Sequence, residues 1–274
     1  MDLDKFYKYA GYFFAIITPV FLFLFFIDRS FLTTLFLLLC PVFSFISFRK
    51  SRKITHDYEH KVKAAEEQKQ LEIREKEEQL ERQKLLQVEK EKALISPIFF
   101  DTETTGVRTD GYDEVLSLSI VDKDGKVLFS QFIKPSHRKR WTKAEDINGI
   151  TPEMVKQCKT IDVYITQIQE IFNHASIVIG YNTEFDLSFL RNVGLVYDGY
   201  TADVMLDFAR VAGDWSNKYG DYKWKKLTQC ARYYKYNWGK NAAHNSTEDT
   251  LATRFCFYKM LETSGMASWT LRRQ

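Results

Sequence analysis

The hydrophobic and polar positions divide this chain into three segments. Residues 1–48 are largely apolar, residues 49–94 are almost all charged or polar, and residues 95–274 alternate apolar runs with polar turns. A final segment of that length can bury the core of one domain. The pattern therefore predicts an apolar amino-terminal part, a charged connector and one globular domain.

The apolar segment contains two runs that a short polar break separates. The first covers residues 9–27, the break is Asp28-Arg29-Ser30, and the second covers residues 31–48. Each run has about the 17 to 25 residues with which a helix crosses a hydrocarbon core. Since backbone groups in lipid must be paired within a helix, the pattern predicts a transmembrane helical hairpin that binds the membrane through residues 10–48. The alternative is a signal peptide over the first run, although no small-residue cleavage site follows it.

A dense basic cluster, Arg49-Lys50-Ser51-Arg52-Lys53, follows the second run. Positive charge beside a span marks its cytoplasmic end, and two spans return the amino terminus to the same side. Residues 1–53 are therefore predicted to be a hairpin with a basic juxtamembrane cluster. The predicted location is a membrane, the bacterial inner membrane by our interpretation, with everything after Arg49 in the cytoplasm.

The connector, residues 54–94, contains neither glycine nor proline and is rich in Glu, Gln, Lys and Arg. Pairs such as Glu72 and Lys76 have the i,i+4 order that stabilises a helix. The apolar positions keep no clean heptad, so a solvated single helix is favoured over a coiled coil. The connector is predicted to act as a spacer, and it is also the candidate segment for a homodimer.

The globular segment begins with three predicted strands, and the second and third are joined by Asp122-Lys123-Asp124-Gly125, a strong hairpin signal. Helices and strands alternate after them, which implies a mixed α/β fold. We expect the domain to cover residues 95–263 and residues 264–274 to form a flexible tail. The predicted strands are 97–102, 114–121, 126–134, 176–180 and 201–205, and the predicted helices are 142–147, 160–174, 183–192, 206–212, 225–235 and 247–262.

Two carboxylates lie near the end of the first predicted strand. Asp101 and Glu103 stand two residues apart after an apolar run, and side chains i and i+2 of a strand share a face. Paired carboxylates repel one another unless a cation lies between them, and oxygen ligands suit hard divalent ions. Asp186 and the pair His244 and Asp249 follow downstream. The sequence therefore predicts a two-metal hydrolase site.

Composition limits which partners and metal ions the predicted site would bind. The formal charge of +3 does not by itself argue for nucleic acid, and the four cysteines show no paired spacing. They fit a reducing compartment better than a disulfide framework or a zinc site. An all-carboxylate site favours Mg²⁺ or Mn²⁺, because zinc prefers histidine and cysteine.

Three motifs in order resemble those of the DEDDh, or DnaQ-like, 3′–5′ exonucleases. They are Asp101-Thr102-Glu103-Thr104-Thr105-Gly106, Asn182-x-x-Phe185-Asp186 and His244-x-x-x-x-Asp249. The resemblance covers roughly residues 97–262 and includes Ile147-Asn148-Gly149-Ile150-Thr151. It implies an α/β fold with a ribonuclease H-like mixed sheet flanked by helices, preceded here by the predicted transmembrane hairpin and a long charged helix.

The resemblance also implies roles for single residues. Asp101 would bridge two ions, Glu103 and Asp249 would complete the site of one ion, and Asp186 would support the other. His244 would take the proton from the attacking water, because imidazole titrates near physiological pH. These five are the predicted catalytic residues, and the two ions would be Mg²⁺ or Mn²⁺. The predicted contacts to the terminal nucleotide are Thr104, Thr105, Gly106, Asn182 and Phe185.

Two features depart from the family pattern. Tyr181 stands where the family often has histidine before the asparagine of the second motif, and we expect altered packing with retained activity. Residues 213–224 form an aromatic, polar excursion that is longer than the minimal fold requires. In the third motif, the five-residue offset keeps His244 and Asp249 off one helix face. We therefore expect His244 in a loop and Ser246 as the cap of the helix that carries Asp249.

Two surface groups keep two interpretations each. The basic cluster at residues 137–141 either contacts phosphates or is a solvated loop. The aromatic residues of the excursion either stack on unpaired bases or pack the edge of the fold. They are Trp215, Tyr219, Tyr222 and Trp224.

The sequence thus predicts a membrane-anchored, metal-dependent 3′–5′ exonuclease that releases nucleoside 5′-monophosphates from single-stranded or frayed nucleic acid, with DNA favoured. The first alternative is an exoribonuclease resembling RNase T or oligoribonuclease. The second is a catalytically silent, membrane-tethered nucleic-acid-binding or scaffolding protein. Degenerate members of the family would have lost ligand positions, and this chain keeps all five.

Overall fold

A computed structural model describes residues 17, 20, 29–238 and 245–274. The chain divides into two compact units, Met1–Leu80 and Glu81–Gln274. Helix α2 runs without interruption from Arg29 to Ala93. The helix predicted over the charged connector is therefore confirmed, and the side chains of residues 56–89 are exposed along it. The homodimer through the connector stays a prediction.

The predicted membrane hairpin is only partly covered by the described residues. Its first run, residues 9–27, lies outside them except for Ile17 and Val20, and its second run, residues 31–48, falls in α2. Within the described part of the chain, no helix combines the length and the apolar character that a membrane crossing needs. The hairpin therefore gains no support from the structure and stays a prediction.

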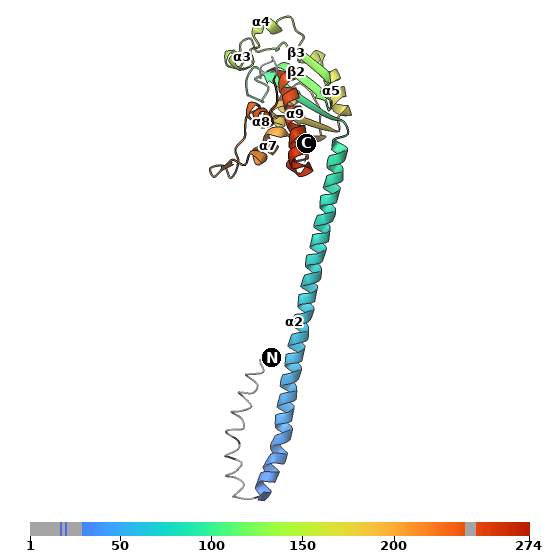
Figure 1. Ribbon diagram of the computed structural model, residues 1–274, viewed down its shortest axis with the longest axis vertical. Coiled ribbons are helices and arrows are strands. Elements are labelled where there is room, and N and C mark those ends of the chain that lie inside the picture. The colour runs from blue at the N-terminus through green and yellow to red at the C-terminus, as the bar shows by residue number, and fades with distance from the viewer. Residues whose placement is uncertain (1–16, 18–19, 21–28, 239–244) are drawn as a thin grey trace. The chain divides into compact units, whose positions relative to one another are not determined.

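The second unit is built on a six-stranded mixed sheet with the order β3-β2-β1-β4-β5-β8 (Figure 1). The strands β1, β2 and β3 are antiparallel neighbours, as the predicted hairpin requires, whereas β4 and β5 run parallel to β1. This arrangement confirms the α/β mixed sheet predicted from the sequence. The strands are β1 Pro97–Thr104, β2 Val115–Asp122, β3 Val127–Phe132, β4 Ile177–Gly180, β5 Tyr200–Asp203 and β8 Arg272–Arg273.

Helices cover both faces of the sheet and supply its two main cores (Figure 1). On one face, α5 and α6 pack against Phe100 and Leu118, and on the other α7, α8 and α9 pack against Phe99 and Ile179. The helices of the unit are α3 Thr142–Asn148, α4 Pro152–Val155, α5 Ile165–His174, α6 Thr183–Asn192, α7 Val204–Ala212, α8 Leu227–Tyr233 and α9 Ser246–Ser264, with 3-10 turns at Ile161–Val163 and Met266–Ser268.

Strand β1 serves both cores because its side chains alternate. Phe99 belongs to the core under α8 and α9, whereas Phe100 belongs to the core under α5 and α6. Both phenylalanines are fully buried. The polar residues that follow on the same strand alternate in the same way. The two faces toward which they point determine the layout of the candidate site.

The prediction of a flexible carboxy-terminal tail is wrong. Residues Arg272 and Arg273 pair with β5, and Trp269 is 1% exposed in the core under α9. Lys90, from the last turns of α2, donates hydrogen bonds to the carbonyl oxygens of Met266 at 2.7 Å and Trp269 at 2.5 Å. The tail is ordered because its apolar side chains complete the core, and the domain begins before the predicted boundary at residue 95.

Replacing Trp269 tests this anchoring. Trp269→Ala should lower the free energy of unfolding by about 3–5 kcal/mol, because it removes a large buried ring without refilling its volume. Urea denaturation of the full chain measures the change. Val196→Ala is the matched control, since Val196 is 75% exposed and its truncation should cost less than about 0.5 kcal/mol. A Trp269→Ala protein as stable as wild type would mean that the tail does not belong to the core.

Candidate active site

Three carboxylates converge at the end of β1. Asp101 and Glu103 have the same parity as Phe99, so they project to the face that α9 covers, and Asp249 lies in the first turn of α9. One carboxylate oxygen from each of the three lies within 4.8 Å of the others. The structure thus brings together residues that stand almost 150 positions apart, as the sequence predicted.

The start of α9 is held by capping and by a cluster of hydroxyl groups. Asn245, not Ser246, caps the helix, because its side chain accepts hydrogen bonds from the backbone N–H of Thr247 at 3.1 Å and of Glu248 at 3.4 Å. Ser246 instead points into the fold, where its Oγ lies 2.7 Å from that of Ser117 and 2.9 Å from that of Ser119.

The hydroxyl cluster also includes Thr247 of the same helical turn and Ser130 of β3. Thr247 Oγ1 lies 2.7 Å from Ser119 Oγ and 2.9 Å from Ser130 Oγ. These bonds tie the first turn of α9 to β2 and β3, and Asp249 follows within that turn. The serines of β2 alternate with apolar residues, which was the signal in the sequence that could have revealed this contact.

Asp186 is held on the other side of β1. It lies in the first turn of α6 and is 2% exposed, and its Oδ1 accepts hydrogen bonds from the backbone N–H of Thr102 at 3.0 Å and from Thr102 Oγ1 at 2.5 Å. Thr102 has the parity of Phe100, so it faces α6. Asp186 is therefore near the cluster without belonging to the group of three oxygens, and its role as a metal ligand stays a prediction.

Burial and mutual repulsion raise the pKa values of these carboxyl groups. For Asp101, burial and then the charges of Asp186, Asp249 and Glu103 raise the pKa well above its ordinary range. Burial, followed by Asp249 and Asp186, raises the pKa of Glu103 to about 8, although a hydrogen bond from Asn148 opposes the rise. Burial raises the pKa of Asp186 to about 7 against the bonds from Thr102. Acids that are buried or partly buried beside one another in this way are costly to ionise unless a cation balances them.

The donor set fits a hard divalent cation. Every donor atom in the group is a carboxylate oxygen, which suits Mg²⁺ or Mn²⁺ and not zinc. Asn148, whose role the sequence did not reveal, steadies the site, since its side chain bonds Glu103 and donates to the carbonyl of Thr104 at 3.3 Å. The predicted base, His244, lies outside the described residues, as does the rest of residues 239–244.

Two cavities open beside the carboxylates. The first, of about 680 Å³, is lined by Glu103, by the predicted contacts Thr104, Thr105 and Gly106, and by Arg140. A side chain at Gly106 would collide with the carboxylate of Asp113, which accounts for glycine there.

The second cavity, of about 480 Å³, is lined by Asn182, Asp249 and Trp224. Asn182 adopts a left-handed backbone conformation, with φ 73°, immediately before α6. Phe185, the last predicted contact, packs instead on Phe189 with ring centroids 5.0 Å apart. Four of the five predicted substrate contacts therefore line a cavity at the carboxylates.

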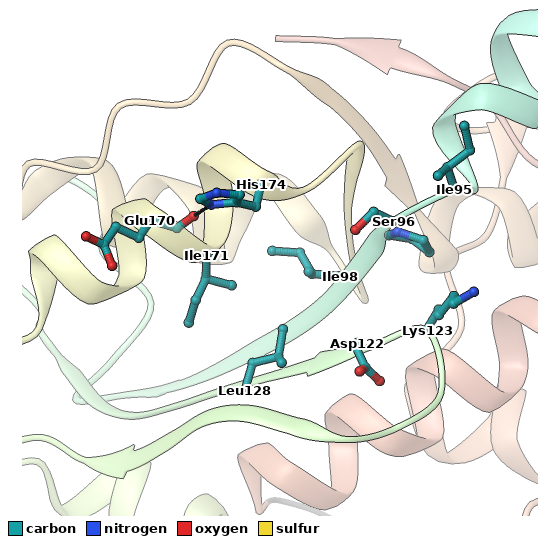
Figure 2. Close-up of a pocket in the computed structure, with 10 residues that line it drawn as sticks. Ile95, Ser96, Ile98, Asp122, Lys123, Leu128, Glu170, Ile171 and His174 are labelled. Carbon is teal, nitrogen blue, oxygen red and sulfur yellow. Dashed lines mark hydrogen bonds between the residues drawn. The ribbon is translucent and has the colours of Figure 1, made fainter.

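A further cavity lies at the opposite, amino-terminal end of β1 (Figure 2). It measures about 440 Å³ and is lined by Ile95, Ile98 and Leu128 together with Glu170 and His174. His174 bonds the backbone oxygen of Glu170 through Nδ1 at 2.7 Å, as Figure 2 shows. None of the three clustered carboxylates lines it, so it is not part of the candidate site.

The sequence model of a family described as an exonuclease, RNase_T, matches residues 98–254, which is more than half of the chain. The DNA polymerase III PolC-type of Listeria innocua is 29% identical over 170 residues, and the match covers 60% of this chain and 11% of that protein. The DNA polymerase III subunit epsilon-like protein of Rhodobacter capsulatus is 25% identical over 173 residues and is covered to 23% of its length. The chain thus spans less than a quarter of either relative.

A similar fold occurs in the solved structure of an exonuclease I from Methylocaldum szegediense. The superposition has a TM-score of 0.51 at 18% sequence identity, and it covers 63% of this chain and 42% of that chain. At this identity the likeness concerns the fold alone. It agrees with the mixed sheet described above.

The raised pKa values predict how stability depends on pH and on metal. The folded state holds the protons of Glu103 and Asp186 more tightly than the unfolded state, so this contribution to stability is present at low pH and is lost as the pH rises through about 7 to 8. In EDTA, the Tm should therefore fall between pH 6 and pH 9. Mg²⁺ should raise the Tm more at pH 8.5 than at pH 6, because it binds the ionised carboxylates.

Thermal unfolding of Asp249→Asn tests whether the carboxylate cluster causes this dependence of the Tm on pH and Mg²⁺. That variant should have a higher Tm than wild type in EDTA at pH 8.5 and should lose most of the rise with Mg²⁺. Asp198→Asn, at an exposed position, is the control and should behave like wild type. A wild-type Tm that does not respond to Mg²⁺ at pH 8.5 would argue against a cation at this cluster.

Proposed function

The chain belongs to the exonuclease family, and from that premise we propose that it is a metal-dependent 3′–5′ exonuclease acting on single-stranded or frayed nucleic acid, with DNA favoured. It would release nucleoside 5′-monophosphates. The observation that carries this proposal is the convergence of Asp101, Glu103 and Asp249 within 4.8 Å. The preference for DNA is supported by relatives that are DNA polymerases by name.

The clustered carboxylates would hold the divalent ions, with Asp186 as the further ligand that the family pattern implies. Bound ions of this kind activate water and stabilise the charge that develops on the phosphate. The fold positions these carboxylates. Strand β1 presents Asp101 and Glu103, and the hydroxyl cluster holds the helical turn that carries Asp249 beside them. His244, directly before the capped start of α9, is proposed to take the proton of the attacking water.

The larger cavity is proposed to receive the terminal nucleotide. Thr104, Thr105 and Gly106 line it together with Glu103, and Arg140 and Lys143 add positive charge to its lining. Within the described residues, neither Arg140 nor Lys143 forms an ion pair with a carboxylate, so both can contact a phosphate. This favours the phosphate-binding interpretation of the basic cluster for Arg140.

Turnover by the full chain tests the proposed function. In Mg²⁺ or Mn²⁺, 5′-labelled single-stranded DNA should be shortened from its 3′ end, faster than matched RNA or fully paired duplex. Asp101→Ala should abolish the hydrolysis, because it removes a carboxylate from the ion site, whereas Asp162→Asn on the surface should not. Faster cleavage of RNA would favour the exoribonuclease alternative. Binding without turnover by the wild type would favour the silent binding protein.

Removing the proposed base should separate catalysis from metal binding. His244→Ala should lower kcat by about 100- to 10,000-fold, the usual contribution of a general base. The Mg²⁺-induced rise in Tm should survive, since imidazole is not a proposed ligand. Full activity in this variant would remove His244 from the mechanism.

We also propose that residues 10–48 anchor the protein to a membrane, with the exonuclease unit in the cytoplasm. The support is the two apolar runs and the basic cluster that follows them. Protease treatment of intact bacterial cells that express the full chain should leave the exonuclease unit uncut, and lysis should expose it. Recovery of the protein in the unsedimented fraction after lysis would contradict the anchor, and cleavage in intact cells would contradict the orientation.

A further inference from the structure

The two departures from the family pattern meet in space. Tyr181 precedes the second motif, and its hydroxyl donates a hydrogen bond of 2.6 Å to the backbone carbonyl of Lys225, the residue directly after the aromatic excursion. The tyrosine thus reaches a segment more than 40 residues away. It anchors that segment beside Asn182, the next residue of the motif.

The excursion forms a small hairpin whose two short strands pair at its base. Strand β6, Trp215–Ser216, pairs with β7, Asp221–Tyr222, and the rings of Trp215 and Tyr222 meet edge to face with centroids 5.2 Å apart. Two of the four aromatic residues are thereby accounted for by packing against each other. At the tip, Tyr219 lies under the ammonium group of Lys218.

Beyond the hairpin, Trp224 is held by its neighbours on both sides. Lys223 Nζ lies 3.1 Å and Lys225 Nζ 2.6 Å from the carboxylate of Asp214, and the backbone N–H of Lys223 donates to the carbonyl of Asp214 at 2.8 Å. These bonds and the one from Tyr181 fix the backbone on either side of Trp224.

Trp224 nevertheless leaves most of its own ring exposed. Its exposed fraction is 64%, and among the described residues no aromatic ring packs on its indole. A large exposed aromatic ring on a restrained backbone is a preformed platform for another flat group.

The ring lines the smaller cavity at the carboxylates. Trp224 shares this cavity of about 480 Å³ with Asp249, Asn182 and Lys226, and its volume is within the range of about 300–1,000 Å³ that small-molecule sites have. Lys226 is exposed, and no described carboxylate forms an ion pair with it. A flat apolar surface and a cation without an ion pair thus lie in a cavity that shares Asp249 with the carboxylate cluster, whereas the proposed terminal-nucleotide cavity shares Glu103 with it.

We propose that this second cavity binds the nucleotide on the 5′ side of the scissile phosphate, with its base stacked on Trp224 and its phosphate near Lys226. The inference rests on the proposed function, since it places the scissile phosphate at the carboxylates between the two cavities. A base that stacks on Trp224 has left its partner strand. Trp224 therefore selects unpaired 3′ ends, and it does so without reading sequence, because every base presents a flat face.

The test measures binding and turnover separately. Fluorescence anisotropy of 5′-fluorescein-labelled decadeoxyadenylate gives the Kd of the full chain with Ca²⁺ in place of Mg²⁺, and the oligonucleotide is checked for integrity afterwards. Trp224→Ala should weaken binding about tenfold, within the range for loss of one stacked base, and Trp224→Phe should stay within about threefold of wild type. Tyr219→Ala, at the hairpin tip, is the matched control and should leave the Kd unchanged.

Oligonucleotides with one abasic position locate the stacked base. In the wild type, an abasic residue at the second position from the 3′ end should weaken binding as much as Trp224→Ala does. In the Trp224→Ala protein, the same abasic residue should add less than about a twofold penalty, because the partner ring is already gone. This lack of additivity is a signature that general damage to the fold would not produce.

The two proposals fail in different ways. An unchanged Kd in Trp224→Ala, or an abasic penalty that persists in full in that variant, overturns the stacking inference even if Mg²⁺-dependent turnover is normal. Absence of turnover with Mg²⁺ or Mn²⁺ counts against the proposed function, while the binding measurements still decide the role of Trp224. A variant Tm equal to that of wild type verifies that the exposed ring is not needed for folding.

Discussion

The alternation of side chains along β1 is the constraint on which the rest of the site depends. Phe99 and Phe100 fill opposite cores, so a slip by one residue would turn each ring toward the wrong core and turn Asp101 and Glu103 away from α9. The same register sends Asp101 and Glu103 toward α9 and Thr102 toward α6. Packing of apolar side chains thereby holds two carboxylates together against their repulsion. Burial, and after it the charges of neighbouring carboxylates, raises the pKa values of both groups.

Much of the fold could be predicted because its signals are local. Backbone and side-chain preferences within a few residues determine the hairpin turn at residues 122–125, the apolar runs of the strands and the positions of the helices. The sheet forms from these elements. The convergence of Asp101, Glu103 and Asp249 was also predicted, although from the resemblance to a family as well as from strand parity.

The missed features depend on contacts between distant residues. Ser246 is a good helix cap by residue type, but Ser117 and Ser119 compete for its hydroxyl, and Asn245 takes the cap. The tail after residue 263 lacks a strong periodic pattern, yet Trp269 fills a space that α9 leaves. Asp186 of α6 accepts hydrogen bonds from Thr102 of β1, which stands 84 positions earlier in the chain. No single stretch of sequence contains these pairings.

Metal binding at the carboxylate cluster is the most direct test of the proposed active site. Crystals of the full chain or of its exonuclease unit soaked in Mn²⁺ would reveal bound ions by their anomalous scattering. We expect a peak between the carboxylate oxygens of Asp101, Glu103 and Asp249, and its loss in Asp249→Asn crystals. Anomalous peaks for Mn²⁺ at other positions in the crystal, with no peak at these three side chains, would contradict the assignment of a metal-dependent active site.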